Sequence, residues 1–176
     1  MSSNLENFTK WYVHPITTLR DNPDAGFIIM MVAFSLIERY LRKKLHLSES
    51  DKLSDPFHKE LYSLFPELLT VKHAKEFWSI HRNGILHQTT PSEKFIPAKP
   101  TGYSHEIEGP VEVVSNGFLI RPSTFIDRVL NTILGDFSTY EGGTSSPSLP
   151  VVQPYATETG GAIEITISSS AGLAKI

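Results

Sequence analysis

Apolar side chains recur three and four residues apart along most of the chain, which predicts a mainly helical fold. A first helix is expected over residues 4–20, with Pro15 kinking it or splitting it in two. A second should run from the start signal Asn22-Pro23-Asp24 to about Leu45. Its stretch Gly26–Ile37 is apolar on every side, so we expect it to be the central buried element.

Further helices are expected over residues 54–66, 71–88 and 122–134, and a β-hairpin over residues 111–120. The hairpin is predicted from two short apolar runs separated by Asn116-Gly117, a pair typical of tight turns. The fold class is therefore mainly α: a bundle of about four to five helices with a small hairpin before the last helix.

Two segments differ in character from the helices. Residues 89–109 form a proline-containing connection of about 20 residues, longer than most connections within a domain. Residues 135–176 are rich in Gly, Ser and Pro, and only 162–168 alternate as a strand would. We therefore expect one helical domain over residues 1–134, followed by a tail over residues 135–176.

Composition excludes few functions. The chain has no cysteine, which excludes disulfides and thiolate metal sites and is compatible with a cytoplasmic location. We expect no signal peptide, and the longest apolar run, Gly26–Ile37, is too short to span a bilayer. The net charge is −3, and all of this excess lies in residues 135–176, so the helical part is neutral. A neutral domain can still bind RNA through a local patch.

The candidate chemistry lies in the helix expected over residues 71–88, where Arg82, Asn83 and His87 fall within about one and a half turns. Asn83 and His87 lie on nearly the same face, with Arg82 beside them. Arginine offers a planar fork of donors to a phosphate, and histidine exchanges a proton near neutrality. The alternative is ordinary: polar and basic residues are also common near the C-terminal end of a helix, where they stay solvated.

The segment RNGILHQ, residues 82–88, resembles the RNG-x-x-H form of the motif that marks the HEPN superfamily, whose members include RNA-cleaving toxins and defence proteins. The resemblance covers roughly residues 22–134. Arg39 and His46 have a compatible spacing too, but the Arg82 copy carries Asn83 at the polar position, has the fuller RNG form and ends a late helix.

The resemblance implies a HEPN-like helical bundle and a metal-independent endoribonuclease that needs no cofactor. His87 would act as general base or acid, Arg82 would stabilise the phosphate, and Asn83 would orient a phosphate oxygen or the imidazole. It also implies a homodimer through the Arg82–His87 helix, with RNA as substrate and, in a toxin setting, an antitoxin as protein partner.

Other readings remain open. The chain would also fit a non-catalytic HEPN-like dimeric module that binds a protein partner or a nucleotide, or an unrelated helical protein in which the motif is accidental. Basic residues at the end of the second helix, Arg39, Arg42, Lys43 and Lys44, are weak candidates for RNA binding. For His58, His73 and His81 we expect surface or packing roles, and no histidine pair is matched with a carboxylate as a metal site would need.

Overall fold

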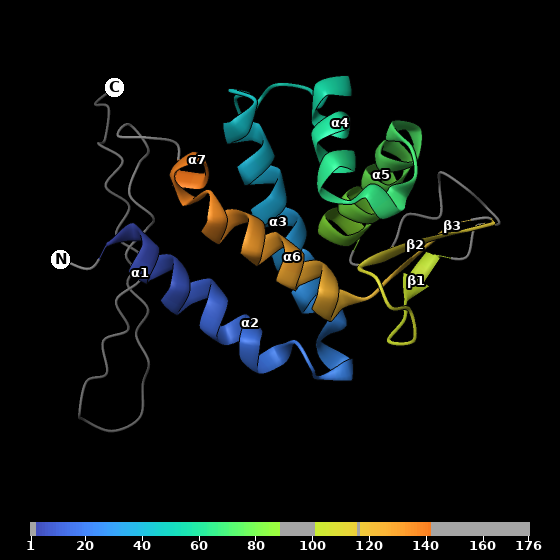
Figure 1. Ribbon diagram of the computed structural model, residues 1–176, viewed down its shortest axis with the longest axis horizontal. Coiled ribbons are helices and arrows are strands. Elements are labelled where there is room, and N and C mark those ends of the chain that lie inside the picture. The colour runs from blue at the N-terminus through green and yellow to red at the C-terminus, as the bar shows by residue number, and fades with distance from the viewer. Residues whose placement is uncertain (1–2, 89–100, 116, 142–176) are drawn as a thin grey trace, which may run out of the picture.

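The computed structural model describes residues 3–88, 101–115 and 117–141, and within these ranges the side chains of residues 83–88 and of Thr101 are not described. The fold is mainly helical with a small sheet before the last helices, as the sequence predicts. In Figure 1, α6 (Pro122–Gly135) crosses α3 (Gly26–Lys44) at the centre of the molecule. α4 (Asp55–Leu64) and α5 (Val71–Gln88) pack against each other and against α3.

The first predicted helix forms as three consecutive segments: α1 (Asn4–Phe8), a π-helical turn η1 (Thr9–Val13) and α2 (His14–Leu19). The wide π turn ends just before Pro15, which has no N–H to continue the α-helical ladder. The backbone stays in the right-handed helical region at Phe8, Thr9 and His14, so the helix continues past Pro15 with a π turn and is not split in two. The rod is held to the body by the ring of Phe8, which contacts Tyr140 in α7 (Phe137–Glu141).

α3 begins where the sequence places it, after Asn22 caps the short 3-10 turn η2 (Pro23–Ala25) by accepting from the Asp24 N–H. It contacts α4, α5, α6 and α7, so it is central. The expectation that its first half is buried on every side is wrong. Ile28 is 54% exposed, and Phe27 and Met31 are also exposed, because the neighbouring elements leave this strip of α3 uncovered in the described part of the chain.

The core is built around aromatic rings from α3, α5 and α6. Phe34 contacts both Phe77 and Phe125, and all three are fully buried. The predicted third helix ends at Leu64, followed by a 3-10 turn η3 (Pro66–Leu68), and α5 has the predicted bounds. Packing of these rings fixes the relative positions of α3 and α5, the two helices that carry the candidate residues.

The predicted hairpin is present as β2 (Val111–Val114) antiparallel to β3 (Gly117–Ile120). A third strand not expected from the sequence, β1 (Thr101–Tyr103), lies parallel to β3 and gives the order β1-β3-β2. Phe118 of β3 packs on Phe77 of α5, so the sheet covers part of that helix. The sequence pattern places residues 101–103 in the connection instead, because a three-residue strand leaves little periodicity to detect.

The helical fold continues past residue 134, where we placed the end of the domain. α7 packs on α3, and Tyr140 is buried there. The expected strand over residues 162–168 and the rest of 142–176 lie outside the described residues. No helix in the described ranges combines the length and the apolar content that crossing a membrane requires.

Candidate functional site

Arg82 lies on α5 immediately after a face that is buried in the core, formed by Ala74, Phe77 and Trp78. Its guanidinium is therefore held at the edge of the core, with 23% of the side chain exposed. The Arg82 Nε donates to Glu38 Oε2 of α3 over 2.7 Å. This ion pair connects the candidate motif on α5 to the basic end of α3.

Glu38 is the centre of a three-residue charge network. Its second oxygen, Oε1, accepts from the Nε of Arg42, one turn along α3, over 2.9 Å. The Nη1 of Arg42 donates in turn to the backbone carbonyls of Ser48 and Asp51, at 2.7 and 3.0 Å. Arg42 thereby fixes the loop after α3 as well as the Glu38 carboxylate. Arg42, a weak candidate for RNA binding, thus has a defined structural role.

A pocket of about 550 Å³ opens beside this network, and we call it the Arg82 pocket. Its cations are Arg39, Arg42, Lys43 and Arg82, and its carboxylates are Glu38 and Glu49. Ser35, Leu47 and Ser48 are the other described residues of the lining. The structure therefore brings the motif arginine together with three of the four basic residues predicted on α3, and cations outnumber carboxylates among the described lining residues.

Arg39 also lines the Arg82 pocket, and its guanidinium carbon lies 5.1 Å from the centre of the Tyr140 ring. Such a contact favours a cation over an aromatic face. Burial raises the pKa of the Tyr140 phenol to about 12, against the opposing effect of the Arg39 charge. Tyr140 is therefore neutral at physiological pH and serves as a packing surface for the arginine.

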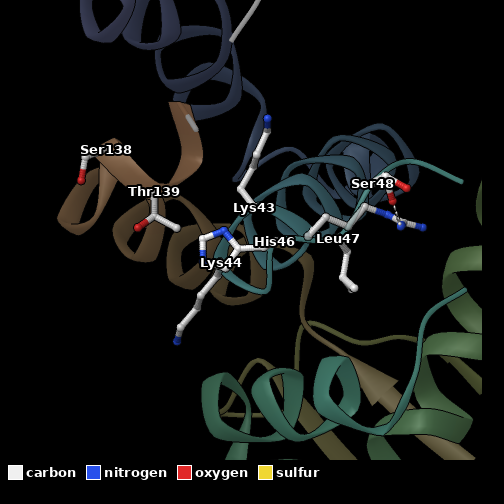
Figure 2. A pocket seen from close by; sticks show the side chains of 8 residues that line it. Lys43, Lys44, His46, Leu47, Ser48, Ser138 and Thr139 are labelled. Carbon is white, nitrogen blue, oxygen red and sulfur yellow. Dashed lines mark hydrogen bonds between the residues drawn. The ribbon is translucent and has the colours of Figure 1, made fainter. Parts of the chain in front are cut away.

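Lys44 does not join Arg82. Its Nζ pairs with Glu60 of α4 at 2.6 Å, and it lines a second pocket of about 710 Å³. Figure 2 shows this second pocket, which we call the His46 pocket. It is lined from the end of α3 by Arg42, Lys43, Lys44, His46, Leu47 and Ser48, and from α7 by Ser138 and Thr139.

The two pockets share the wall formed by Arg42, Lys43, Leu47 and Ser48. Arg39 and His46, whose sequence spacing also matched the motif, line different pockets. Asn83 and His87 belong to α5 by their backbone, but the placement of their side chains lies outside the described residues.

His81 is fully buried, and neither ring nitrogen has a hydrogen-bond partner among the described residues. Its ring packs between Phe34, Phe77 and Phe118. Burial lowers its pKa to about 3, so the imidazole is neutral at physiological pH. The predicted packing role is confirmed.

The other two histidines also have the expected structural roles. His58 is buried on α4, and burial lowers its pKa. A ring nitrogen of His73, Nδ1, lies 2.9 Å from the Leu68 carbonyl. Within the described ranges, no group of three or more His, Cys, Asp or Glu is gathered as a metal site would need.

Sequence reasoning missed Glu38, which organises the site. One signal was available, because a glutamate four residues before an arginine on a helix is a favourable pair. The pairing with Arg82 had no such signal, since the two residues are 44 positions apart. Comparisons of the chain with protein families, with curated proteins and with solved structures gave no match.

Proposed function

We propose that this protein is a metal-independent endoribonuclease of the HEPN type. The observation that carries the proposal is the Arg82 pocket, where the motif arginine of α5 meets Arg39, Arg42 and Lys43 of α3. A cluster of guanidinium and ammonium groups beside an open cavity suits the phosphates of an RNA strand. The Glu38 contact fixes the orientation of the Arg82 guanidinium at the wall of this pocket.

In the proposed reaction, the ribose 2′-oxygen attacks the adjacent phosphorus while the bond from phosphorus to the 5′-oxygen breaks. His87 removes the 2′-hydroxyl proton or supplies a proton to the departing 5′-oxygen. Arg82 binds the phosphate and stabilises the negative charge that grows in the transition state. Asn83 orients the phosphate or the imidazole. The products are a 2′,3′-cyclic phosphate and a 5′-hydroxyl.

A homodimer through the Arg82–His87 helix would place two imidazoles at one cleft, one for each proton transfer. Two-fold interfaces are the commonest way in which soluble chains assemble. We place this activity in the cytoplasm, where RNA substrates and an antitoxin partner would be met.

A second candidate function is a non-catalytic HEPN-like module that binds a protein partner or a nucleotide. One observation favours it: Arg82 is ion-paired with Glu38 and only partly exposed, as expected of a residue that maintains an interface. In a catalytic site, Arg82 must also reach a phosphate. The two functions therefore differ in whether RNA is cut.

The deciding experiment is cleavage of single-stranded RNA in the presence of EDTA, with the product ends analysed. We expect wild type to leave 2′,3′-cyclic phosphates and the His87→Ala variant to lose at least a hundredfold in rate, the range of general acid–base catalysis. His14→Ala is the matched control, because His14 is exposed on α2 and lines neither pocket.

Equal cleavage by wild type and His87→Ala would refute the assigned mechanism. A folded wild-type dimer that cleaves no RNA would support the binding module instead. Analytical ultracentrifugation of the same samples establishes whether a dimer is present.

A further inference from the structure

The end of α3 is closed by a non-glycine residue in the left-handed region. His46 has φ of 54°. The Leu47 N–H donates to the Arg42 carbonyl at 2.8 Å and the His46 N–H to the Lys43 carbonyl at 3.1 Å, which is the Schellman pattern of a helix C-terminus. Glycine usually occupies the position that His46 has here, because a side chain strains the backbone in this conformation.

The strained cap places the His46 imidazole in a pocket of cations and hydroxyls. In Figure 2 the ring extends from the end of α3 toward Thr139 of α7, and Lys43 and Lys44 extend from the same helix end. The described lining residues of the His46 pocket include no carboxylate. Backbone strain of this kind is concentrated at ligand sites, where it fixes the direction of a side chain.

The wall opposite α3 is also fixed in place. Asp136, which precedes α7, accepts hydrogen bonds from the Tyr40 hydroxyl at 3.0 Å and from the Thr139 side chain, and the latter contributes most to lowering the pKa of the Asp136 carboxyl. The Asp136 charge is thus engaged by hydroxyl donors, and it is not among the residues that line the pocket.

We propose that the His46 pocket binds a second phosphate of the RNA strand whose scissile phosphate occupies the Arg82 pocket. This inference rests on RNA as the ligand of the proposed function. The two pockets share Arg42 and Lys43, so one strand lying across this wall reaches both. Lysine and hydroxyl donors are groups that proteins direct at phosphate oxygens, and an imidazole N–H can donate in the same way.

A purely structural origin makes a different prediction. Cations at a helix C-terminus interact favourably with the backbone dipole and need no ligand. In that case replacing His46 by glycine would relieve strain and change nothing else. If the imidazole is held for a ligand, the same replacement preserves the fold and weakens binding.

The test uses 2′-O-methyl oligouridylates, which cannot undergo attack by the 2′-oxygen, and measures affinity by fluorescence anisotropy at several salt concentrations. A dinucleotide has one bridging phosphate and engages the Arg82 pocket alone, whereas an octanucleotide spans both pockets. We expect His46→Gly and Lys44→Gln each to weaken binding of the octanucleotide about three- to tenfold and to leave the dinucleotide unchanged. Lys44→Gln should also lower the slope of log affinity against log salt by about 0.7, the value for one phosphate contact to a single strand.

Two controls match these variants in type. Leu69→Gly replaces another non-glycine residue at positive φ, 64°, outside both pockets. Lys72→Gln removes an exposed cation at the start of α5, also outside both pockets. Both should bind the octanucleotide like wild type. His46→Asn, which tolerates the left-handed cap, should weaken binding as His46→Gly does.

The second-phosphate subsite is overturned if wild type binds the octanucleotide no better than the dinucleotide, or if the His46 and Lys44 variants bind it like wild type. Cleavage is measured separately. If length-dependent binding is lost in these variants but wild type cuts no RNA, the subsite stands and the ribonuclease proposal fails. If wild type cleaves RNA and the variants retain their octanucleotide affinity, the ribonuclease proposal stands and the subsite fails.

Discussion

The Arg82 end of α5 and the His46 end of α3 border the same wall, yet they hold their polar groups in opposite ways. At the Arg82 end, the glutamate Glu38 lies between two arginines, and the neighbouring His81 is enclosed by aromatic rings. At the His46 end, an exposed imidazole and two lysines sit on a strained helix cap that faces the hydroxyls of α7.

The difference shows how the same residue types divide between folding and binding. Arg42 and Arg82 are mostly buried and share one carboxylate, so their charges contribute directly to the fold. The ion pair of Lys44 with Glu60 is partly exposed on both sides and contributes at most about 1 kcal/mol. Substitutions at the Arg82 end should therefore alter stability, and those at the His46 end should alter binding.

Glu38→Gln should have the largest effect, because it removes the carboxylate that Arg42 and Arg82 share. Breaking a buried ion pair leaves uncompensated charge, and we expect the free energy of unfolding to fall by about 3 kcal/mol. Folded Glu38→Gln protein should bind RNA more tightly than wild type, since the Arg82 pocket loses one negative charge. Urea unfolding and anisotropy measure the two effects.

Glu49→Gln is the control for Glu38→Gln. Glu49 lines the same pocket but is exposed, and its substitution should change stability by less than about 0.5 kcal/mol. Equal stability losses in the two variants would show that the ion pairs of Glu38 with Arg42 and Arg82 are not the cause of the loss. The contrast drawn between the Arg82 site on α5 and the His46 end of α3 would then fail.

The sequence predicted the parts of the fold that repeat a local period. The bounds of α5 and the antiparallel hairpin follow from residues close together in the chain, and both were found as expected. What it could not predict depends on distant neighbours. The strip of α3 at Ile28 is exposed because nothing described covers it, and the apolar pattern alone cannot show which face is left uncovered.

The same reasoning applies to the candidate site. Arg82 was identified from a short motif, and its neighbours Arg39, Arg42 and Lys43 from a basic helix end, but only the fold shows that the two groups share a pocket. Glu38 was missed because its contact with Arg82 joins separate helices. The exclusion of Lys44 from this pocket likewise depends on the turn of α3, which directs it toward Glu60.

His81→Leu should have the second largest effect on stability. Unlike Glu38→Gln it should stabilise the protein, most strongly at low pH. The pKa of His81 is about 3 in the folded protein and about 6.5 in an unfolded chain, so the unfolded state binds more protons between these values. Stability should therefore fall as pH decreases from 6.5 toward 3. Between pH 7 and pH 5 this histidine alone removes about 2 kcal/mol.

His81→Leu should not show this loss of stability with acid. It also replaces an imidazole that has no described hydrogen-bond partner, which should stabilise the protein at pH 7 by about 1 kcal/mol. Urea unfolding at both pH values gives the difference. His14→Leu, at an exposed position, should keep the wild-type pH dependence. If His81→Leu loses stability with acid as steeply as wild type does, His81 is not the group that titrates.

The smallest expected effect concerns the two strained positions, His46 and Leu69. Leu69 has φ of 64°, and the Thr70 N–H donates to the Leu68 carbonyl at 2.7 Å, which marks a tight, strained three-residue turn. Glycine relieves about 1–2 kcal/mol of strain at each site and costs about 0.5–1 kcal/mol in chain entropy, so each variant should gain about 0.5–1 kcal/mol. For a chain of this size, that raises the melting temperature by about 2 °C.

Calorimetry should thus find His46→Gly and Leu69→Gly alike in stability, while only His46→Gly loses affinity for the octanucleotide. If His46→Gly instead lowers the melting temperature, the imidazole stabilises the cap itself, and the strain is no longer evidence for a ligand.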